Sequence, residues 1–164
     1  MRGEEPDLLI VDASVSAKWY LPEELSEEAA SFLEAGARSE KRLVAPSLLA
    51  PELGNVLWHR YRRGDISWDR VREAWGAFSN APLSFAGTEF LMPAALEIAI
   101  GYGCTVYDAL YVALAEAHHD EAAVLLTADR KLVARFTGTP FAGSVRMLDE
   151  ERESVLDEEP TPED

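Results

Sequence analysis

The sequence predicts a single-domain α/β fold, a three-layer α/β/α sandwich with a mostly parallel central sheet. Short, continuously apolar segments alternate along the chain with longer segments in which apolar residues recur at helical spacing. The chain has 164 residues, of which 48% are hydrophobic, so it can bury a sizeable core without disulfides or a structural metal. The sequence contains no internal repeat and no linker, which favours one domain.

The expected strands are short apolar runs, as in a sheet covered by helices on both faces. The first, Leu8–Val11, is apolar at every position and ends at Asp12, which is typical of a buried parallel strand. The remaining expected strands are 42–45, 83–85, 122–127 and 145–148, the last at an edge of the sheet.

Helices are expected between these strands. Ser26 and Ser67 are candidate N-caps, Gly64 is a stop signal, and Pro93 fits only in the first turns of its helix. The run 109–115 is largely apolar, which predicts a helix deep in the domain. The expected helices start near Ser14 and otherwise cover 26–38, 47–63, 67–80, 89–101, 109–115 and 130–135.

Charge is unevenly distributed along the chain. The net charge is −15, which by itself argues against a polyanionic partner. Nine acidic residues and one arginine fall in segment 149–164, which we expect to be a disordered tail behind a domain of residues 1–148. Segment 38–72 has the opposite balance, with eight basic residues against four acidic ones. We therefore expect either a basic face there or an ordinary solvated helix surface.

Four carboxylates occupy comparable positions in this alternation. Asp12 ends the first strand, and Glu52 and Asp108 fall in first turns of helices. Asp129 lies between a late strand and its helix. In an open α/β sheet these positions lie along one edge, where ligands bind. We therefore expect all four carboxylates at one rim of the sheet.

Each carboxylate also has a purely structural interpretation. Asp108 could complete a capping box with Thr105, and Asp129 could cap the helix that follows it. Glu52 could complement a helix dipole, and Asp12 could end its strand by binding backbone amides. Four like charges at one rim nevertheless repel one another unless a cation neutralises them. The basic residues nearest in sequence are Lys18, Arg130 and Lys131.

Oxygen ligands favour a hard cation, Mg²⁺ or Mn²⁺, over zinc. None of the softer ligands has zinc-site spacing, and we interpret all of them as structural; they are His59, His118, His119 and Cys104. A hard cation held by carboxylates can activate water against a phosphodiester. Motifs of P-loop ATPases, serine hydrolases and dinucleotide-binding proteins are missing from the sequence.

Two motifs carry a family resemblance. The segment Tyr107-Asp-Ala-Leu-Tyr-Val-Ala-Leu-Ala115, followed by Leu126-Thr-Ala-Asp-Arg-Lys-Leu132, resembles the PIN-domain family and within it the VapC-type ribonuclease toxins. The weaker Leu9-Ile-Val-Asp12-Ala-Ser14 and Pro51-Glu52-Leu53 precede them in the order of that family. The resemblance covers residues 8 to about 148.

The resemblance implies an Mg²⁺- or Mn²⁺-dependent endoribonuclease with the four carboxylates as its acidic quartet. Asp12 and Asp108 would be direct metal ligands, and Glu52 a ligand or a base that positions water. Asp129 would be the most variable contributor. Ser14 and Thr127 would hydrogen-bond the carboxylates and orient them.

The resemblance also implies partners. VapC-type toxins dimerise and are held inactive by a small antitoxin, whose C-terminal segment covers the acidic site and often presents an arginine to it. For the RNA substrate, the basic segment offers phosphate-binding candidates on one expected helix; these are Arg60, Arg62 and Arg63.

Other roles stay open on the sequence alone. They are a housekeeping RNA-processing nuclease, a catalytically inactive PIN fold that binds metal or RNA, and a receiver-like domain. The receiver-like domain is disfavoured because Leu83–Gly87 lacks an acceptor aspartate. The single cysteine, Cys104, and the charged start Met1–Glu5 predict a cytoplasmic protein without a secretory signal or membrane span.

Overall fold

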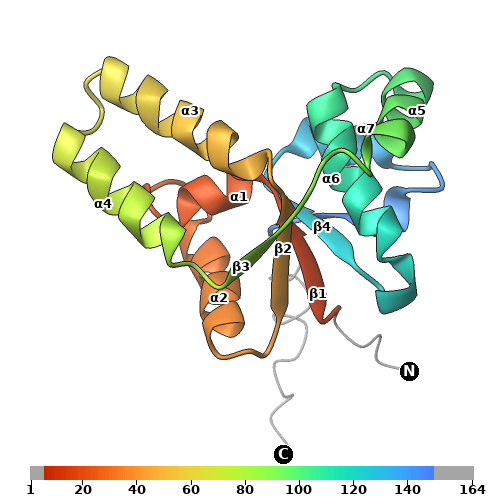
Figure 1. The fold of residues 1–164 in the computed structure, drawn as a ribbon, viewed down its shortest axis with the longest axis horizontal. Coiled ribbons are helices and arrows are strands. Elements are labelled where there is room, and N and C mark those ends of the chain that lie inside the picture. The colour runs from red at the N-terminus through yellow and green to blue at the C-terminus, as the bar shows by residue number, and fades with distance from the viewer. Residues whose placement is uncertain (1–5, 150–164) are drawn as a thin grey trace, which may run out of the picture.

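A computed structural model describes residues 6–149 as helices packed around a five-stranded sheet (Figure 1). The strand order is β3-β2-β1-β4-β5, and every neighbouring pair is parallel. The prediction of an α/β/α fold is confirmed, and the sheet is parallel throughout. The strands are β1 (Leu8–Val11), β2 (Arg42–Pro46), β3 (Leu83–Ala86), β4 (Val124–Thr127) and β5 (Val145–Met147).

Strand β1 lies at the centre of the sheet and is buried at every position. Its side chains alternate between two cores: Leu8 and Ile10 belong to the larger hydrophobic cluster, and Leu9 and Val11 to the smaller one. A strand covered on both faces has no polar side to present, which explains its continuously apolar sequence.

The helices cover both faces of the sheet and one end of it. Helices α1 and α2 lie on one side, and α5, α6 and α7 on the other, while α3 and α4 project together beyond the sheet (Figure 1). The helices are α1 (Ala13–Lys18), α2 (Ser26–Ala37), α3 (Leu49–Arg62), α4 (Trp68–Ser79), α5 (Met92–Tyr102), α6 (Val106–Ala117) and α7 (Arg130–Phe136), with short 3₁₀ turns η1 (His119–Glu121) and η2 (Ala142–Ser144).

Helix α6 is the buried helix that the apolar run predicted, because residues 109–115 are all buried. Within the described part of the chain, no single helix is long and apolar enough to cross a membrane. Helices α5 and α6 meet that criterion only as a pair bent by 118°.

Most of the expected helix ends are confirmed. Ser67 caps α4 through the backbone N–H of Arg70, and Gly64 adopts a left-handed φ of 78° just after α3. Pro93 lies in the first turn of α5, although that helix begins at Met92 rather than at residue 89.

The prediction that Ser26 caps α2 is wrong. The N-cap position belongs to Leu25, which has a left-handed φ of 64°. The Ser26 hydroxyl instead accepts from the Glu23 backbone N–H at 2.9 Å and donates to the Leu21 carbonyl at 3.1 Å. Ser26 thus closes the loop before the helix, because its hydroxyl reaches backward rather than into the first turn.

The acidic segment that we expected to be disordered falls, apart from Asp149, outside the described residues.

Candidate active site

Asp12 follows β1 directly and caps α1. Its Oδ1 accepts hydrogen bonds from the Ser14 hydroxyl at 2.6 Å and the Val15 backbone N–H at 3.1 Å, and its Oδ2 accepts from the Thr127 hydroxyl. The residue is only 7% exposed. Burial raises the pKa of Asp12, and the hydrogen bonds from Ser14, Thr127 and Val15 offset part of that increase. Asp12 thus binds a backbone amide, as its structural interpretation allowed, and does so as the N-cap of α1.

Ser14 and Thr127 connect the ends of β1 and β4. The Ser14 hydroxyl accepts from the Ala128 backbone N–H at 2.9 Å, and the Thr127 hydroxyl accepts from the Asp129 backbone N–H at 3.0 Å. Each hydroxyl therefore donates to Asp12 and accepts from the loop that follows β4. These bonds fix the Asp12 carboxylate relative to Asp129.

Asp129 is the N-cap of α7, as its position after β4 allowed. Its Oδ1 accepts from the backbone N–H groups of Lys131 at 2.9 Å and Leu132 at 3.3 Å. The side chain lines a pocket beside Ser14 and is exposed. Asp129 thus combines a capping role with an accessible carboxylate.

Glu52 lies in the first turn of α3 and is partly buried. Its Oε2 accepts a hydrogen bond from the Tyr111 hydroxyl on α6. Burial raises the pKa of Glu52, the Tyr111 bond lowers it, and the charges of Asp12 and Asp108 raise it further. Glu52 is therefore held in place by one neutral donor while two like charges act on it.

Asp108 lies in the first turn of α6, where Thr105 is the N-cap. The Thr105 hydroxyl accepts from the Asp108 backbone N–H at 3.0 Å and donates to Asp108 Oδ2 at 2.8 Å. The expected capping contact is present, but the carboxylate binds the threonine hydroxyl rather than a backbone N–H. Asp108 Oδ1 receives no hydrogen bond from the described residues.

The structure brings Asp12, Glu52 and Asp108 close enough for their charges to interact. Asp129 is linked to Asp12 only indirectly, because its backbone N–H donates to the Thr127 hydroxyl while its carboxylate caps α7. Within residues 6–149, no three Asp, Glu, His or Cys side chains converge closely enough to ligate one ion as they stand. The donor chemistry still fits a hard divalent cation, because the carboxylates supply only oxygen and repel one another without a counter-charge.

Tyr111 is a contributor that the sequence motifs did not single out. It is 3% exposed, and burial together with its bond to Glu52 raises the pKa of its hydroxyl, so the hydroxyl remains protonated and donates. Its spacing of three residues from Asp108 on the same helix was the one available sequence signal.

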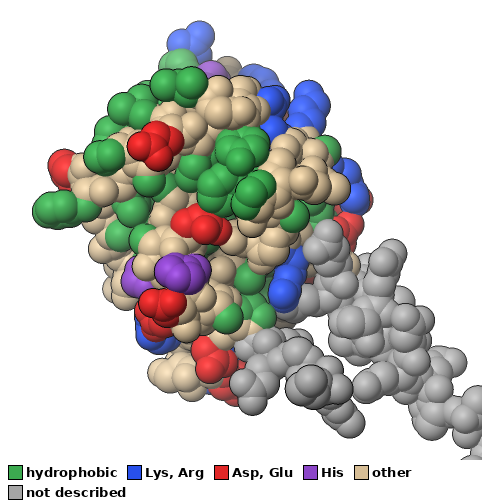
Figure 2. Space-filling model, turned by 90° about the vertical axis from the view of Figure 1, so that its right-hand side faces the viewer, with side chains coloured by type: hydrophobic (Ala, Val, Ile, Leu, Met, Phe, Trp, Pro, Cys, Tyr) green, Lys and Arg blue, Asp and Glu red, His purple; other side chains and the backbone are tan. Residues whose placement is uncertain are grey.

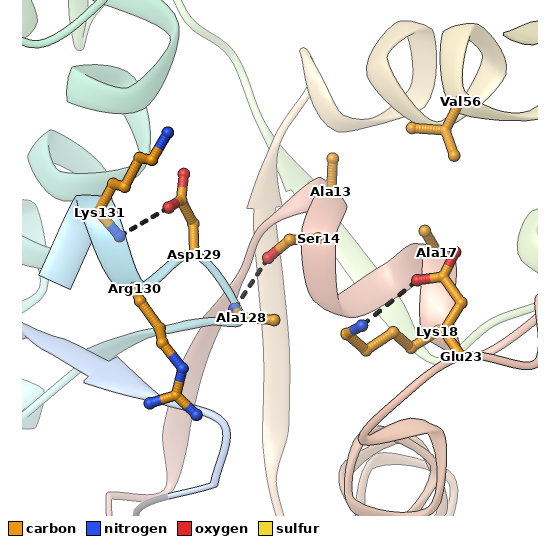
Figure 3. A pocket seen from close by; sticks show the side chains of 10 residues that line it. All are labelled: Ala13, Ser14, Ala17, Lys18, Glu23, Val56, Ala128, Asp129, Arg130 and Lys131. Carbon is orange, nitrogen blue, oxygen red and sulfur yellow. Dashed lines mark hydrogen bonds and ion pairs between the residues drawn. The ribbon is translucent and has the colours of Figure 1, made fainter.

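A pocket of about 750 Å³ opens beside Ser14 and Asp129, between α1 and the start of α7 (Figure 3). We call it the basic pocket, because Lys18, Arg130 and Lys131 line it together with two carboxylates. Lys18 is paired with Glu23 at 3.3 Å, and Arg130 with Asp149 at 2.6 Å. The Lys131 ammonium has no side-chain partner among the described residues.

The basic segment 38–72 does not form one basic face. Arg38, Lys41 and Arg42 lie at or before the amino end of β2, at the sheet edge opposite the carboxylates. Arg60 pairs with Glu23, and Arg63 with Asp65 at 3.3 Å, whereas Arg62 lies over the Trp58 ring at 5.3 Å. The two groups are separated because Arg38, Lys41 and Arg42 lie at the start of β2, whereas Arg60, Arg62 and Arg63 lie at the end of α3, the helix that follows β2.

Comparison with known proteins decides the family. A model of the PIN domain matches residues 9–136. The chain belongs to the PIN-domain family. Ribonuclease VapC3 of Pyrobaculum aerophilum is a 38% identical relative over 132 residues, which span 78% of this chain and 94% of that protein. The resemblance drawn from the sequence motifs is confirmed.

Two solved structures share the PIN fold. PAE2754 from P. aerophilum superposes with a TM-score of 0.63 at 23% identity, covering 96% of this chain and 95% of that one. A toxin-antitoxin complex from Klebsiella pneumoniae gives a TM-score of 0.52 at 16% identity, covering 85% and 97%. At these identities the likeness shows the fold alone.

Proposed function

We propose that this PIN-domain protein is an Mg²⁺- or Mn²⁺-dependent endoribonuclease and the toxin of a toxin–antitoxin pair. The observation that carries the proposal is the placement of Asp12, Glu52 and Asp108 at the carboxyl edge of the sheet, where the two acids at helix starts, Glu52 and Asp108, lie near the end of β1 and the charges of Asp12 and Asp108 raise the pKa of Glu52. The relationship to Ribonuclease VapC3, which spans nearly all of that protein, supports RNA as the substrate.

Asp12 and Asp108 would hold the ion, with Glu52 and Asp129 as further oxygen ligands or partners of bound water. When bound, the ion lowers the pKa of a coordinated water and neutralises charge that develops on the phosphate. Ser14 and Thr127 orient both oxygens of Asp12 by donating to them. Tyr111 holds Glu52 in one orientation, which suits a carboxylate that positions the attacking water.

The RNA backbone would enter the basic pocket, where Lys131 can meet phosphate oxygens. Lys18 and Arg130 line the same pocket but would first have to leave Glu23 and Asp149. Arg62 adds a cation on the adjoining surface of α3, since it stacks on Trp58 rather than pairing with an acid. Arg60 and Arg63 would contribute less, because Glu23 and Asp65 already neutralise them.

A small antitoxin and a second copy of this chain are the proposed protein partners. The Klebsiella structure shows that a chain of this fold occurs in a toxin-antitoxin complex. Figure 2 shows hydrophobic side chains spread over the face formed by α5 and α6. Ile100 on α5 is 82% exposed, and Phe90, two residues before α5, is 92% exposed. Exposed apolar side chains of this kind suit a protein interface such as that of a homodimer.

The test is cleavage of total cellular RNA by the purified protein in Mn²⁺, beside an EDTA control and an Asp108→Asn variant. The matched control is Asp120→Asn, which changes the same chemical group on η1, where the side chain is 91% exposed. We expect discrete fragments with wild type and Asp120→Asn, and none with Asp108→Asn or EDTA.

A circular RNA substrate separates the endonuclease from an exonuclease, since only an internal cut linearises it. Fragments that persist in EDTA or with Asp108→Asn would contradict a carboxylate-held metal. Growth arrest on expression, relieved by a co-expressed small protein, would separate a toxin from a housekeeping nuclease.

A further inference from the structure

A second pocket, of about 680 Å³, opens on the other side of the candidate site between α3 and the start of α6. Glu52 lines it, together with Trp58, Tyr107 and Asn55. We call it the aromatic pocket. Because Glu52 belongs both to this pocket and to the carboxylate cluster, a molecule bound here lies against the candidate catalytic residues.

Two aromatic rings from different helices line this pocket while facing solvent. Trp58 on α3 is 48% exposed, and Tyr107 on α6 is 61% exposed. Neither is needed to fill the core, whose large side chains lie elsewhere on these helices, as Leu57 and Leu110 do. Exposed aromatic faces beside a phosphodiester-cleaving site are suited to stacking on unpaired bases, because every base has a π face.

Two neighbours of Trp58 complete a nucleotide-sized environment. The guanidinium of Arg62 lies 5.3 Å from the Trp58 ring centre and can meet a backbone phosphate next to a stacked base. The side-chain amide of Asn55 is exposed and makes no hydrogen bond to another described residue, so it is available to a base edge.

Gly54 keeps the pocket open. A Cβ added at this position would meet no atom within 4 Å, and its φ is not in the left-handed region. The residue lies inside α3, where glycine is less favourable than alanine by about 1 kcal/mol. The fold therefore does not need glycine here, and a larger side chain would fill the pocket without straining the backbone.

From these contacts we infer that the aromatic pocket binds one unpaired nucleobase of the RNA substrate, stacked on Trp58 and Tyr107 beside Glu52. The inference rests on the proposed ribonuclease function and deepens it, because it assigns Trp58 and Tyr107 the role of positioning one base of the RNA next to Glu52. Duplex RNA cannot place a base in this pocket, because its bases are stacked and paired.

The experiment measures binding of a fluorescein-labelled, unstructured RNA of about 12 nucleotides in EDTA, so that cleavage does not interfere. Trp58→Ala is expected to weaken binding about tenfold, while Trp58→Phe preserves most of the affinity. Gly54→Leu is expected to weaken binding to a similar extent while keeping or raising the melting temperature, since it fills the pocket and favours the helix. The matched control is Trp75→Ala on α4, which removes another exposed indole and should leave affinity unchanged.

A second arm uses RNAs that carry one abasic nucleotide, moved stepwise along the strand. One position should weaken binding to wild type about tenfold and have little further effect on Trp58→Ala, because both changes remove the same stacking contact. Weak binding of the matching duplex to all variants supports the same conclusion.

The two proposals fail separately. RNA binding that depends on Trp58 and Gly54, in a protein that never cleaves RNA, supports the base pocket and overturns the nuclease. Metal-dependent cleavage with unchanged RNA affinity in Trp58→Ala and Gly54→Leu overturns the base pocket and leaves this surface to a protein partner.

Discussion

The basic pocket and the aromatic pocket adjoin different carboxylates of the candidate site, Asp129 and Glu52, and offer different chemistry. Lys18, Arg130 and Lys131 line the first, and Trp58 and Tyr107 line the second. Cations suit phosphate oxygens, whose binding is sensitive to salt, whereas aromatic faces suit bases, whose stacking depends much less on charge. The difference indicates how an acidic chain can bind RNA. Cations and aromatic rings at the site attract the RNA locally, although the net charge of −15 repels it at long range.

The largest effect is expected from the carboxylates that lie between the two pockets. Asp12→Asn should reduce the cleavage rate by more than the ~100-fold typical of losing a partner of a metal ligand, because it alters a proposed metal ligand itself. Single-turnover cleavage measures this, with Asp120→Asn as control. RNA affinity in EDTA should not fall, since both pockets remain. Normal cleavage by Asp12→Asn would contradict a catalytic role for Asp12.

The same substitution, Asp12→Asn, also tests how Asp12 affects the stability of the fold at different pH values. Burial raises the pKa of Asp12 in the folded protein, so the folded state favours its protonated form. The contribution of Asp12 to stability is therefore present below its ordinary pKa of 3.8 and is lost as pH rises through the raised value. In EDTA, the free energy of unfolding of Asp12→Asn relative to wild type should increase as pH rises from 3.8 to the raised pKa of Asp12, and should level off above it. Chemical denaturation at several pH values tests the sign, and a flat difference would contradict it.

The next effect concerns the hydroxyl that links Asp12 to the β4 loop. Thr127→Val keeps the side-chain shape but removes the donor to Asp12, and we expect a rate loss of about 10–100-fold with ~1–2 kcal/mol lower stability. Thr137→Val is the matched control, because that hydroxyl is exposed and donates to the Val133 carbonyl at 3.0 Å, away from the carboxylates. Equal rates in the two variants would show that Thr127 serves the fold alone.

A smaller effect distinguishes the two pockets by salt. Lys131→Ala should weaken RNA binding several-fold and reduce the slope of log affinity against log salt by about 0.7, the value for one phosphate contact on a single strand. Gly54→Leu should weaken binding without changing that slope, because it blocks a base rather than a phosphate. Lys41→Ala at the far edge of the sheet is the control. If Gly54→Leu also changed the slope of log affinity against log salt, the aromatic pocket would contact phosphate as the basic pocket does, and the distinction between them would be wrong.

The smallest effect is expected from Arg60 and Arg63 together. Replacing both with alanine should change RNA affinity by about twofold or less, because Glu23 and Asp65 already pair with them. Binding titrations at two salt concentrations measure this. A large loss of affinity with a reduced salt slope would instead support the basic surface that the sequence left open, and would place RNA along the end of α3.

Much of the fold was predictable because its signals are local. Continuous apolar strands indicate a sheet covered on both faces, and the buried run 109–115 was recognisable as a core helix. Ser67 and Gly64 mark helix ends through their own backbone chemistry. The role of Ser26 was mispredicted because a serine hydroxyl can reach backward into a loop as easily as forward into a helix.

The sequence by itself determined the family, the order of the elements and the four acidic positions at strand ends and helix starts, since each depends on neighbouring residues. Only the tertiary structure decided which distant groups meet: Thr127 with Asp12, Tyr111 with Glu52, and Glu23 with Arg60. It also placed Trp58 and Tyr107 on one pocket and separated Arg42 from Arg60. The reason is that these contacts depend on how the helices pack on the sheet, and the spacing of residues along the chain does not determine that packing.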